Sequence, residues 1–471
     1  MSSYLTSTKG TQSVNTESLQ AAFEGAIITP ASPTYNLARK IWNGMIDRHP
    51  ALIAQCNGVA DVQAAVRFAR EHDLLVAIKA GGHNVAGTAV CDGGMVIDLS
   101  PMKGMRVDPA ARTAWAEPGL LWGEFDHETQ AFGLATTGGI VTHTGMAGLT
   151  LGGGIGWLMR KHGLSCDNLL EADVVTADGE FLKASEQENA DLFWGIRGGG
   201  GNFGIVTNFK FRLHPVGPEV LAGPILYPAE QAQEVLEAYR DAIANAPDEL
   251  GTIVNLRHAP PAPWLPESVH GQPVVLIAVC YAGPVDEAKA VIAPFHKLGT
   301  PIANAIRPMP YTTLQGMFDA SVPHGLHYYW KSHYSASLSN DAIRTLAALA
   351  WKTKSPSSYT IIFHMGGAVR HVSEEATAFK GRTALHAINV NAAWRPDFEA
   401  GREDIQWTQE LWSALAPYSD GGVYMNFLGD EGQDRVKAAY GAATYERLVA
   451  LKDKYDPTNF FRMNQNIKPT V

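Results

Sequence analysis

The chain has 471 residues, of which 46% are hydrophobic and 18% charged, and its formal net charge is −10. This length exceeds one ordinary hydrophobic core, so two or three domains are expected. The composition is typical of a soluble globular protein, and no run of about 18 apolar residues predicts a membrane span. The negative charge and the lack of a basic run exclude a general affinity for nucleic acid or anionic membranes.

The cysteines indicate the redox environment of the chain. Cys56, Cys91, Cys166 and Cys280 lie far apart and lack the spacing of a metal site. They are too few for a disulfide framework, which favours a reducing compartment. The first twenty residues are polar and resemble neither a Sec signal nor a twin-arginine signal. We therefore expect a cytoplasmic protein without a metal site.

The first half of the chain alternates short strands with helices. In chain order we expect a buried strand at 51–57, an amphipathic helix at 58–74, a strand at 75–80, a hairpin at 169–185 and an alternating strand at 205–213. Asp61 is the predicted N-cap of the helix, and Asp178-Gly179 is the predicted turn of the hairpin. This order predicts a small α+β unit.

After Pro215 the pattern changes to longer helices that alternate with strand-like runs. Helices are expected at 230–245, 285–298 and 340–353, and strands at 273–283, 358–369 and 386–394. We interpret this region as a second domain, an antiparallel sheet with helices on one side. The stretch 444–467 is predicted to be a helix followed by a proline turn and a short tail.

Glycine-rich loops dominate the first half. Gly199-x-Gly201-x-x-Gly204 fits the dinucleotide fingerprint, but a strand-like run follows it where that fingerprint requires a helix, and no P-loop motif occurs. The segments GGHNVAG, THTGMAG, GLTLGGGIGW and RGGGGNFG nevertheless allow main-chain amides to approach a ligand closely. Four such loops indicate a ligand longer than a mononucleotide, such as a dinucleotide with a flat ring.

These segments carry a resemblance to a known family. Residues 52–216 are similar to the FAD-binding domain of the vanillyl-alcohol-oxidase (PCMH-type) flavoproteins, and more narrowly to the berberine-bridge-enzyme-like oxidases. The matching segments are IKAGGHNVAG, GGMVIDLS, GLTLGGGIGWLMRKHGLSCDNLLEADVVTADGE, DLFWGIRGGGGNFGIVT and YDPTNFFRMNQNI. Together they cover more than a third of the chain, in the order of the family.

The resemblance implies an α+β fold in which a two-part FAD-binding domain is joined to a substrate domain. That substrate domain would be an antiparallel sheet covered by helices. The implied boundaries place the N-terminal part of the FAD-binding domain at 1–216 and the substrate domain at 217–422. Residues 423–471 would then return to the FAD-binding domain.

Two residues match positions that bond covalently to the flavin in this family. His83 stands where the histidine of the GGH turn bonds to the flavin 8α carbon, and Cys166 stands where a subset of members carries a second, cysteine link to flavin C6. A neutral imidazole and a thiolate both suit such additions. The resemblance implies FAD bonded through both residues, although a packed core thiol is the alternative for Cys166.

The remaining cofactor contacts implied by the resemblance are non-covalent. Gly81, Gly82, Asn84 and Gly87 would wrap the pyrophosphate, and Gly156 and Val206 would lie at the adenine end. Further residues would line the flavin ring or the ribityl chain or return to the flavin: Thr137, Gly138, Thr142, Gly145, Gly148, Gly153, Asn464 and Asn466.

The family takes a hydride from a carbon that bears oxygen or nitrogen and passes the electrons to O2. Its usual bases are absent here, because Phe427 replaces the second tyrosine of a YxNY motif and no glutamate stands near His386. The polar candidates that remain are Tyr424, His364, His386 and Asn426, and of these Tyr424 and His364 are the predicted catalytic residues. Several aromatic residues could form the floor of a substrate pocket: Tyr328, Tyr329, Trp330, Trp394, Trp407 and Trp412.

The leading hypothesis is therefore an FAD-dependent oxidase whose partners are a small organic substrate and O2. A dehydrogenase or reductase on the same fold is the first alternative, and a non-catalytic flavin-binding protein is the second. Amines, sugars and aromatic metabolites all stay open as substrates, because a fold does not determine its ligand.

Overall fold

The computed structural model describes residues 15–470, so residues 1–14 and 471 of the predicted FAD-binding segments lie outside the described part. The first sheet has four strands, with β2 and β3 both parallel to β4 and β1 antiparallel to β2. Across the sheet they are β1 (Ala26–Ile28), β2 (Leu52–Gln55), β4 (Met95–Asp98) and β3 (Val76–Lys79).

Helix α3 (Val59–Glu71) joins β2 to β3 and buries the side chains of Val62, Ala65, Val66, Phe68 and Ala69. This spacing of three and four residues is the apolar face that the sequence predicts. The predicted N-cap was wrong, because the helix begins at Val59 and its N-cap is Gly58. Asp61 lies in the first turn, where its Oδ2 accepts the backbone N–H of Asn57 at 2.9 Å.

The second sheet contains the predicted hairpin. Its strands, in order, are β5 (Met105–Asp108), β6 (Thr113–Ala116), β10 (Ile205–Arg212), β8 (Leu169–Val175) and β9 (Phe181–Ser185). β8 and β9 are antiparallel, and Gly179 has a φ of +75° in the turn between them. β10 follows the glycine loop directly, which confirms that this loop does not open a helix.

Short elements fill the chain between the strands of the second sheet. They are α4 (Trp122–Gln130), β7 (Leu134–Ala135), α5 (Met146–Leu151), α6 (Met159–His162), the 3-10 turn η1 (Ser165–Asn168) and α7 (Ala190–Ile196). This stretch carries most of the glycines that the sequence predicts to contact a cofactor.

The third sheet is antiparallel and has eight strands. Its strands, in order, are β15 (Ala303–Asn304), β12 (Glu219–Pro228), β14 (Pro273–Tyr281), β13 (Leu250–His258), β18 (Tyr359–His364), β19 (His386–Trp394) and β17 (His327–Ser335), with β16 (Arg307–Pro310) paired to β12.

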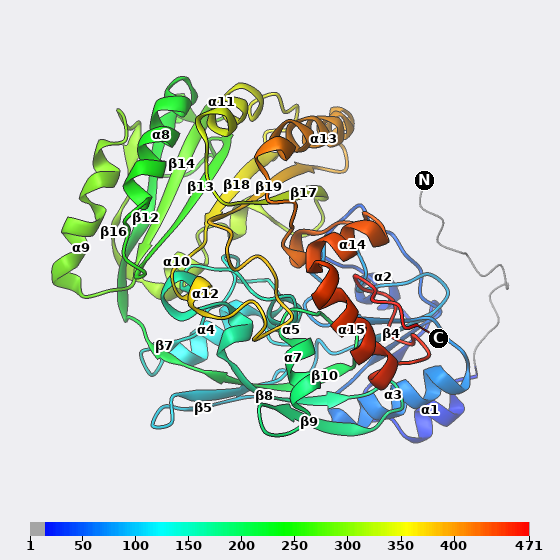
Figure 1. Cartoon of the computed structure of the whole chain (residues 1–471). Helices are drawn as coiled ribbons and strands as arrows, with labels where there is room; N and C mark the ends of the chain where they lie inside the picture. The colour runs from blue at the N-terminus through cyan, green and yellow to red at the C-terminus, as the bar shows by residue number, and fades with distance from the viewer. Residues whose placement is uncertain (1–14, 471) are drawn as a thin grey trace.

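Helices cover the outer face of this sheet (Figure 1). They are α8 (Ala232–Ile243), α9 (Val285–Ile292), α11 (Asn340–Leu349) and α13 (Glu403–Leu415). Their apolar side chains share one core cluster with residues of β12, β13 and β14. The predicted α+β fold, an antiparallel sheet covered by helices beside a mixed-sheet half, is confirmed.

The C-terminal segment packs against the first half of the chain (Figure 1). Helix α14 (Gln433–Tyr440) leads into α15 (Ala442–Tyr455), which contacts α7. Lys452 of α15 is fully buried, and its ammonium pairs with Asp456 and donates to the backbone oxygens of Asn202 and Phe461 at 2.8 and 2.9 Å. These bonds hold the tail beside the glycine loop. Within residues 15–470, no helix has the length and apolar character needed to cross a bilayer.

Candidate active site

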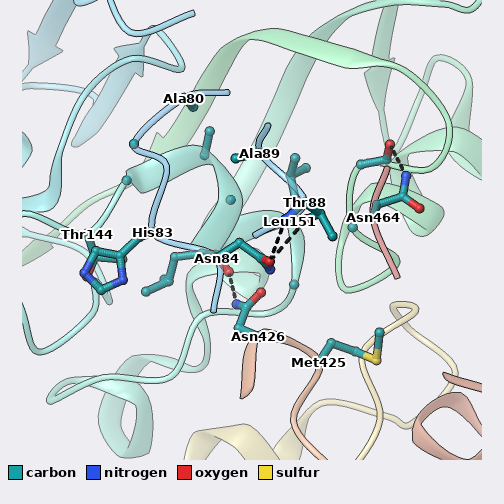
Figure 2. Close-up of a pocket in the computed structure, with 18 of the residues that line it drawn as sticks. Ala80, His83, Asn84, Thr88, Ala89, Thr144, Leu151, Met425, Asn426 and Asn464 are labelled. Atoms are coloured by element: carbon teal, nitrogen blue, oxygen red, sulfur yellow. Dashed lines mark hydrogen bonds between the residues drawn. The ribbon is translucent and has the colours of Figure 1, made fainter. Parts of the chain in front are cut away.

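A cavity of about 320 Å³ lies between the glycine-rich loops of the first half and the inner face of the eight-stranded sheet. Figure 2 shows its glycine-lined part, with His83 towards the left of the view and Asn464 towards the right. The opposite part is walled by aromatic side chains of the third sheet and of the segment after β19. The cavity therefore joins a backbone-lined half to an aromatic half.

His83 lies in the glycine turn after β3 and lines the cavity. Its imidazole stacks on the Trp42 indole, with ring centroids 4.2 Å apart and planes 17° from parallel. Its Nε2 is 3.2 Å from Nδ1 of His143. Burial, followed by the neighbouring His143 and His324, holds the pKa of His83 well below its usual value. The ring is therefore neutral at physiological pH and fixed in orientation from two sides.

About half of the predicted cofactor residues line this cavity. They are Gly81, Gly82, His83, Asn84, Gly145, Gly148, Val206 and Asn464, together with the predicted catalytic Tyr424. Gly81 is needed because a Cβ there would lie 2.4 Å from the Gly145 Cα, so two backbone segments touch where they enter the cavity.

The other predicted contacts lie outside the cavity lining. They are Gly87, Thr137, Gly138, Thr142, Gly153, Gly156 and Asn466. Several of them pack the loops from behind. A Cβ on Gly156 would be 1.6 Å from the Gly138 oxygen, and the Thr137 hydroxyl donates to the Gly163 oxygen at 2.6 Å.

The amide and the hydroxyl of Thr142 both donate to Asp319, which fixes the loop that carries His143. Gly87 faces Ile46, and Gly153 faces Phe379. These residues therefore shape the loops rather than the wall of the cavity.

The wall of the glycine-lined half fits a dinucleotide cofactor. A Cβ on Gly148 or Gly201 would meet no atom within 4 Å, so bare backbone faces the cavity at both positions. Asn464 also lines the cavity, and its Oδ1 is buried without a hydrogen-bond partner among the described residues. Such unshielded amides and one unpaired acceptor are the groups that pyrophosphate, ribityl and adenine atoms would contact.

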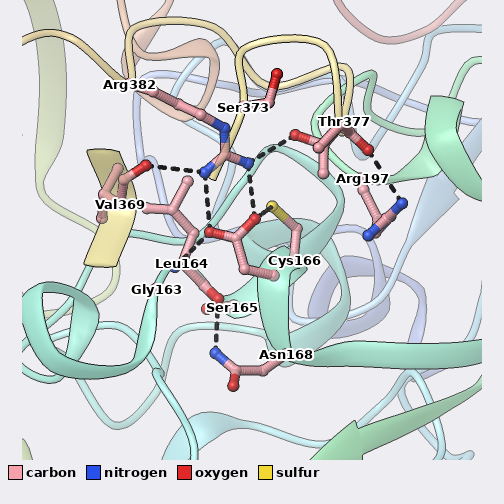
Figure 3. Close-up of polar contacts among 12 residues, drawn as sticks. Gly163, Leu164, Ser165, Cys166, Asn168, Arg197, Val369, Ser373, Thr377 and Arg382 are labelled. Atoms are coloured by element: carbon pink, nitrogen blue, oxygen red, sulfur yellow. Dashed lines mark hydrogen bonds and ion pairs between the residues drawn. The ribbon is translucent and has the colours of Figure 1, made fainter. Parts of the chain in front are cut away.

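Cys166 does not lie in the cavity lining. It is fully buried in η1, where its Sγ is 3.8 Å from Oδ1 of Asp167, and Asp167 is paired with Arg382 (Figure 3). Burial, followed by the charge of Asp167, raises the pKa of the thiol well above its usual value. The thiol of Cys166 is therefore protonated and lies beside an ion pair outside the cavity lining, and the second bond to the cofactor stays a prediction.

Tyr424 lines the cavity, but its hydroxyl is occupied. Its Oη accepts hydrogen bonds from the backbone N–H groups of Gly154 at 2.9 Å and Ile155 at 3.3 Å, and from Nδ2 of Asn426 at 2.7 Å. Burial raises the pKa of Tyr424 to about 12. The phenol is therefore neutral at physiological pH and holds the loop after α5.

His364 does not reach the cavity. It points to the opposite face of β18, where its Nε2 is 3.1 Å from the Arg160 guanidinium and its Nδ1 is 3.4 Å from the Thr252 hydroxyl. Burial, followed by the charge of Arg160, lowers the pKa of His364 to about 2. Strand alternation turns Phe363 and Ile361 towards the cavity instead, so the structure does not bring the predicted catalytic His364 to it.

Sequence reasoning missed several lining residues. Among the predicted aromatic residues Trp330 lines the cavity, whereas Trp42, Asn389 and Asn391 were not considered. For the two asparagines a signal exists, because they alternate with apolar residues along β19. Their exposure to a cavity depends on which face of the sheet is covered by helices.

Comparisons with known proteins show the family of this chain. A family model described as an FAD binding domain matches residues 50–185, and one described as berberine and berberine like matches residues 423–468. The chain is 36% identical over 453 residues to an FAD-linked oxidoreductase of Dictyostelium discoideum, covering 95% of both chains. It is 30% identical over 461 residues to the (R)-6-hydroxynicotine oxidase of Paenarthrobacter nicotinovorans, covering 95% of this chain and 97% of that one.

Two solved structures have a similar fold. The crystal structure of 6-hydroxy-D-nicotine oxidase from Arthrobacter nicotinovorans superposes with a TM-score of 0.86 and 29% identity, covering 95% of this chain and 98% of that one. A xylooligosaccharide oxidase from Myceliophthora thermophila superposes with a TM-score of 0.82 at 24% identity, which is a likeness of fold alone. With its glycine-lined cavity and both family segments in place, the chain belongs to the berberine-bridge-enzyme-like FAD-linked oxidoreductases.

Proposed function

We propose that this protein is an oxidase that takes a hydride from an alcohol or amine carbon of a small organic substrate. The observation that carries the proposal is the cavity in which His83 lies between the glycine-lined half and the aromatic half. FAD, when bound, supplies a two-electron acceptor for the hydride and passes the electrons to O2. An alcohol would become a carbonyl compound or an amine an imine, and O2 would become H2O2.

We further propose that His83 holds the cofactor covalently. Of the two nitrogens of a neutral imidazole, one carries the proton and the other a lone pair. If Nε2 of His83 donates to Nδ1 of His143, the Nδ1 lone pair of His83 is left free to bond to the flavin 8α carbon. A C–H bond of that carbon would break, and its two electrons would pass through the flavin to O2. The stacking of Trp42 keeps this nitrogen in one position. Cys166 faces the Asp167–Arg382 pair, and we therefore propose a single attachment.

The lining supports a reaction that needs little deprotonation by the protein. Among the described residues that line the cavity, none is Asp, Glu, Lys or Arg. Tyr424 is neutral and already accepts three hydrogen bonds. The proposed role of the chain is accordingly to orient a neutral donor and exclude water, so that the hydride leaves a substrate of low charge.

Acid precipitation of the purified protein tests the attachment. The yellow chromophore should stay in the wild-type pellet and move to the supernatant in His83→Ala. His143→Ala should lower the retained fraction, because the imidazole of His83 loses its partner. Cys166→Ala should retain the chromophore with an unchanged spectrum, and His324→Ala, whose ring lies 6.2 Å from that of His83, is a matched control. Chromophore loss from the wild-type protein would contradict the covalent proposal.

Reoxidation separates the oxidase from its alternative, a dehydrogenase or reductase that uses another acceptor. The protein is photoreduced without air and mixed with O2 in a stopped-flow instrument. Reoxidation within seconds, with one H2O2 formed per flavin, is expected of the oxidase. Reoxidation that takes many minutes, together with rapid electron transfer to an artificial dye, would favour the alternative.

A further inference from the structure

The aromatic half of the cavity begins directly beside His83. Trp42, which stacks on His83, meets Trp330 edge to face at 5.4 Å between ring centroids. Trp330 meets Phe427 at 5.6 Å, and Phe427 meets Phe363 at 5.7 Å. These rings form a continuous wall from the proposed cofactor anchor to the strands of the third sheet. A flat, apolar molecule fits such a wall.

No charged side chain belongs to the described lining of the cavity. The guanidinium of Arg257 lies 5.7 Å from the ring centroid of Tyr359, but Arg257 itself is not a lining residue. A ligand that carried a net charge would lose its hydration here without gaining an ionic partner. The site therefore favours an uncharged ligand.

Two buried asparagines of β19 bring amide groups into this half. Asn389 and Asn391 are 1% and 0% exposed, and both line the cavity. Their positions in the sheet bring them beside cavity-lining neighbours, because Asn389 pairs with Ile361 while Asn391 pairs with Tyr359 and Trp330. On β17 the partner of Asn389 is Ser332, which does not line the cavity.

The hydrogen bonds of this pair determine which way each amide points. Nδ2 of Asn391 reaches the backbone oxygens of Asn389 at 2.8 Å and Tyr359 at 3.4 Å, and these oxygens can only accept. The Asn391 Oδ1 therefore faces Asn389 and accepts from its Nδ2 at 2.8 Å. This leaves Oδ1 of Asn389 without a partner among the described residues.

A buried, unpaired acceptor is costly to the folded protein unless a ligand completes it. Because the neighbouring amide prevents a flip, the missing partner must be a donor, an O–H or N–H group. A sugar would require many such partners, whereas the surrounding rings supply few polar groups, namely the unpaired Nε1 of Trp330 and the tyrosine hydroxyls.

From this geometry we infer that Asn389 is a specificity-determining residue, and that the substrate is an uncharged aromatic compound that donates one hydrogen bond to its Oδ1. The inference rests on the proposed function, whose substrate class it names. Asn391 is a positioning residue, because it acts by orienting the Asn389 amide.

Calorimetric titration of the FAD-loaded wild-type protein, without air, provides the first test. The probes are 4-methylphenol and p-xylene, which differ by a hydroxyl in place of a methyl group, with 4-methylbenzoate, 4-methylbenzylammonium and cellobiose as comparators. 4-Methylphenol should bind about tenfold more tightly than p-xylene, as expected for one hydrogen bond to a buried acceptor. Tighter binding of either ion or of cellobiose would overturn the inference.

Substitutions of Asn389 and Asn391 then test whether the preference for 4-methylphenol over p-xylene depends on these two residues. Asn389→Leu should weaken 4-methylphenol about tenfold and leave p-xylene unchanged, so that the preference disappears. Asn391→Leu should reduce the preference as well. Asn255→Leu is the matched control, since Asn255 also has an unpaired, buried Oδ1 but lies on β13, which β18 separates from β19, and does not line the cavity. A preference for the phenol that persists in Asn389→Leu refutes the role of Asn389.

The failure of this inference and the failure of the proposed function give different results. Binding is measured without air, so it does not depend on reaction with O2. A protein that prefers 4-methylphenol but is not reoxidised by O2 would refute only the oxidase. If Asn389→Leu does not fold, the order in which the wild-type protein binds the probes still tests the inferred class of substrate.

Discussion

Replacing Tyr424 by Phe separates a structural role of its hydroxyl from a catalytic one. The substitution removes the acceptor of the Gly154 N–H, which has no other partner, and of the weaker bond from Ile155. Asn426 keeps its second bond, from Nδ2 to the Leu149 oxygen at 3.0 Å. Two buried donors lose their acceptor, so we expect unfolding to become easier by about 2–4 kcal/mol.

Urea unfolding followed by tryptophan fluorescence measures this loss. Tyr227→Phe is the matched control, because Tyr227 is equally buried but donates one bond, to the Phe295 oxygen at 2.8 Å. The Tyr227→Phe substitution should lower the free energy of unfolding by only about 1 kcal/mol. A Tyr424→Phe protein no less stable than the Tyr227→Phe protein would refute the structural role.

The pH profile of kcat/KM completes this test. Because burial raises the pKa of Tyr424 to about 12, its neutral phenol should not produce a limb in the profile below that pH. The profile of Tyr424→Phe should therefore keep the shape of the wild-type profile, even where its height falls. A limb that vanishes in the variant would make Tyr424 the base.

Two further outcomes are expected. Burial raises the pKa of Asp126 to about 7, from 3.8, so this residue lowers stability as the pH rises from about 4 to about 7. The free energy of unfolding of Asp126→Asn minus that of the wild type, measured in urea, should therefore rise by about 2–3 kcal/mol from pH 5 to pH 8. A difference that does not change with pH would contradict the burial of a carboxyl group. Gly148→Ala should fold normally but contain less FAD per protein, since its Cβ would project into the cavity, whereas Gly81→Ala, with a Cβ 2.4 Å from the Gly145 Cα, should not fold. Full FAD content in Gly148→Ala would place the cofactor elsewhere.

Local sequence determined much of this protein. The alternating strands, the amphipathic helices and the Gly179 turn are consequences of side-chain period and backbone freedom, which act within a few residues. The turn that carries His83 is of this kind, because the neighbouring Gly82 has a φ of +64° and the segment must approach Gly145 closely. The glycine loops and the class of ligand that they favour could therefore be predicted from the printed sequence.

The residues that face the cavity were decided by tertiary structure. Strand alternation separates Phe363 from His364, but it does not tell which of them meets the cavity. That choice depends on the helices that cover the other face of the eight-stranded sheet. Likewise, Cys166 follows a motif-like segment, yet its side chain turns to the Asp167–Arg382 pair.

The pairing of distant segments settles the remaining part of the site. Trp42 stacks on His83 and contacts Trp330, although almost 300 residues separate the two tryptophans. Asn389 becomes an unpaired acceptor only because Asn391 and the Tyr359 oxygen fix its orientation. Such contacts depend on packing between sheets, which no local pattern encodes. The sequence therefore predicted residues of the glycine-lined half of the cavity, whereas the tertiary structure decided the aromatic half.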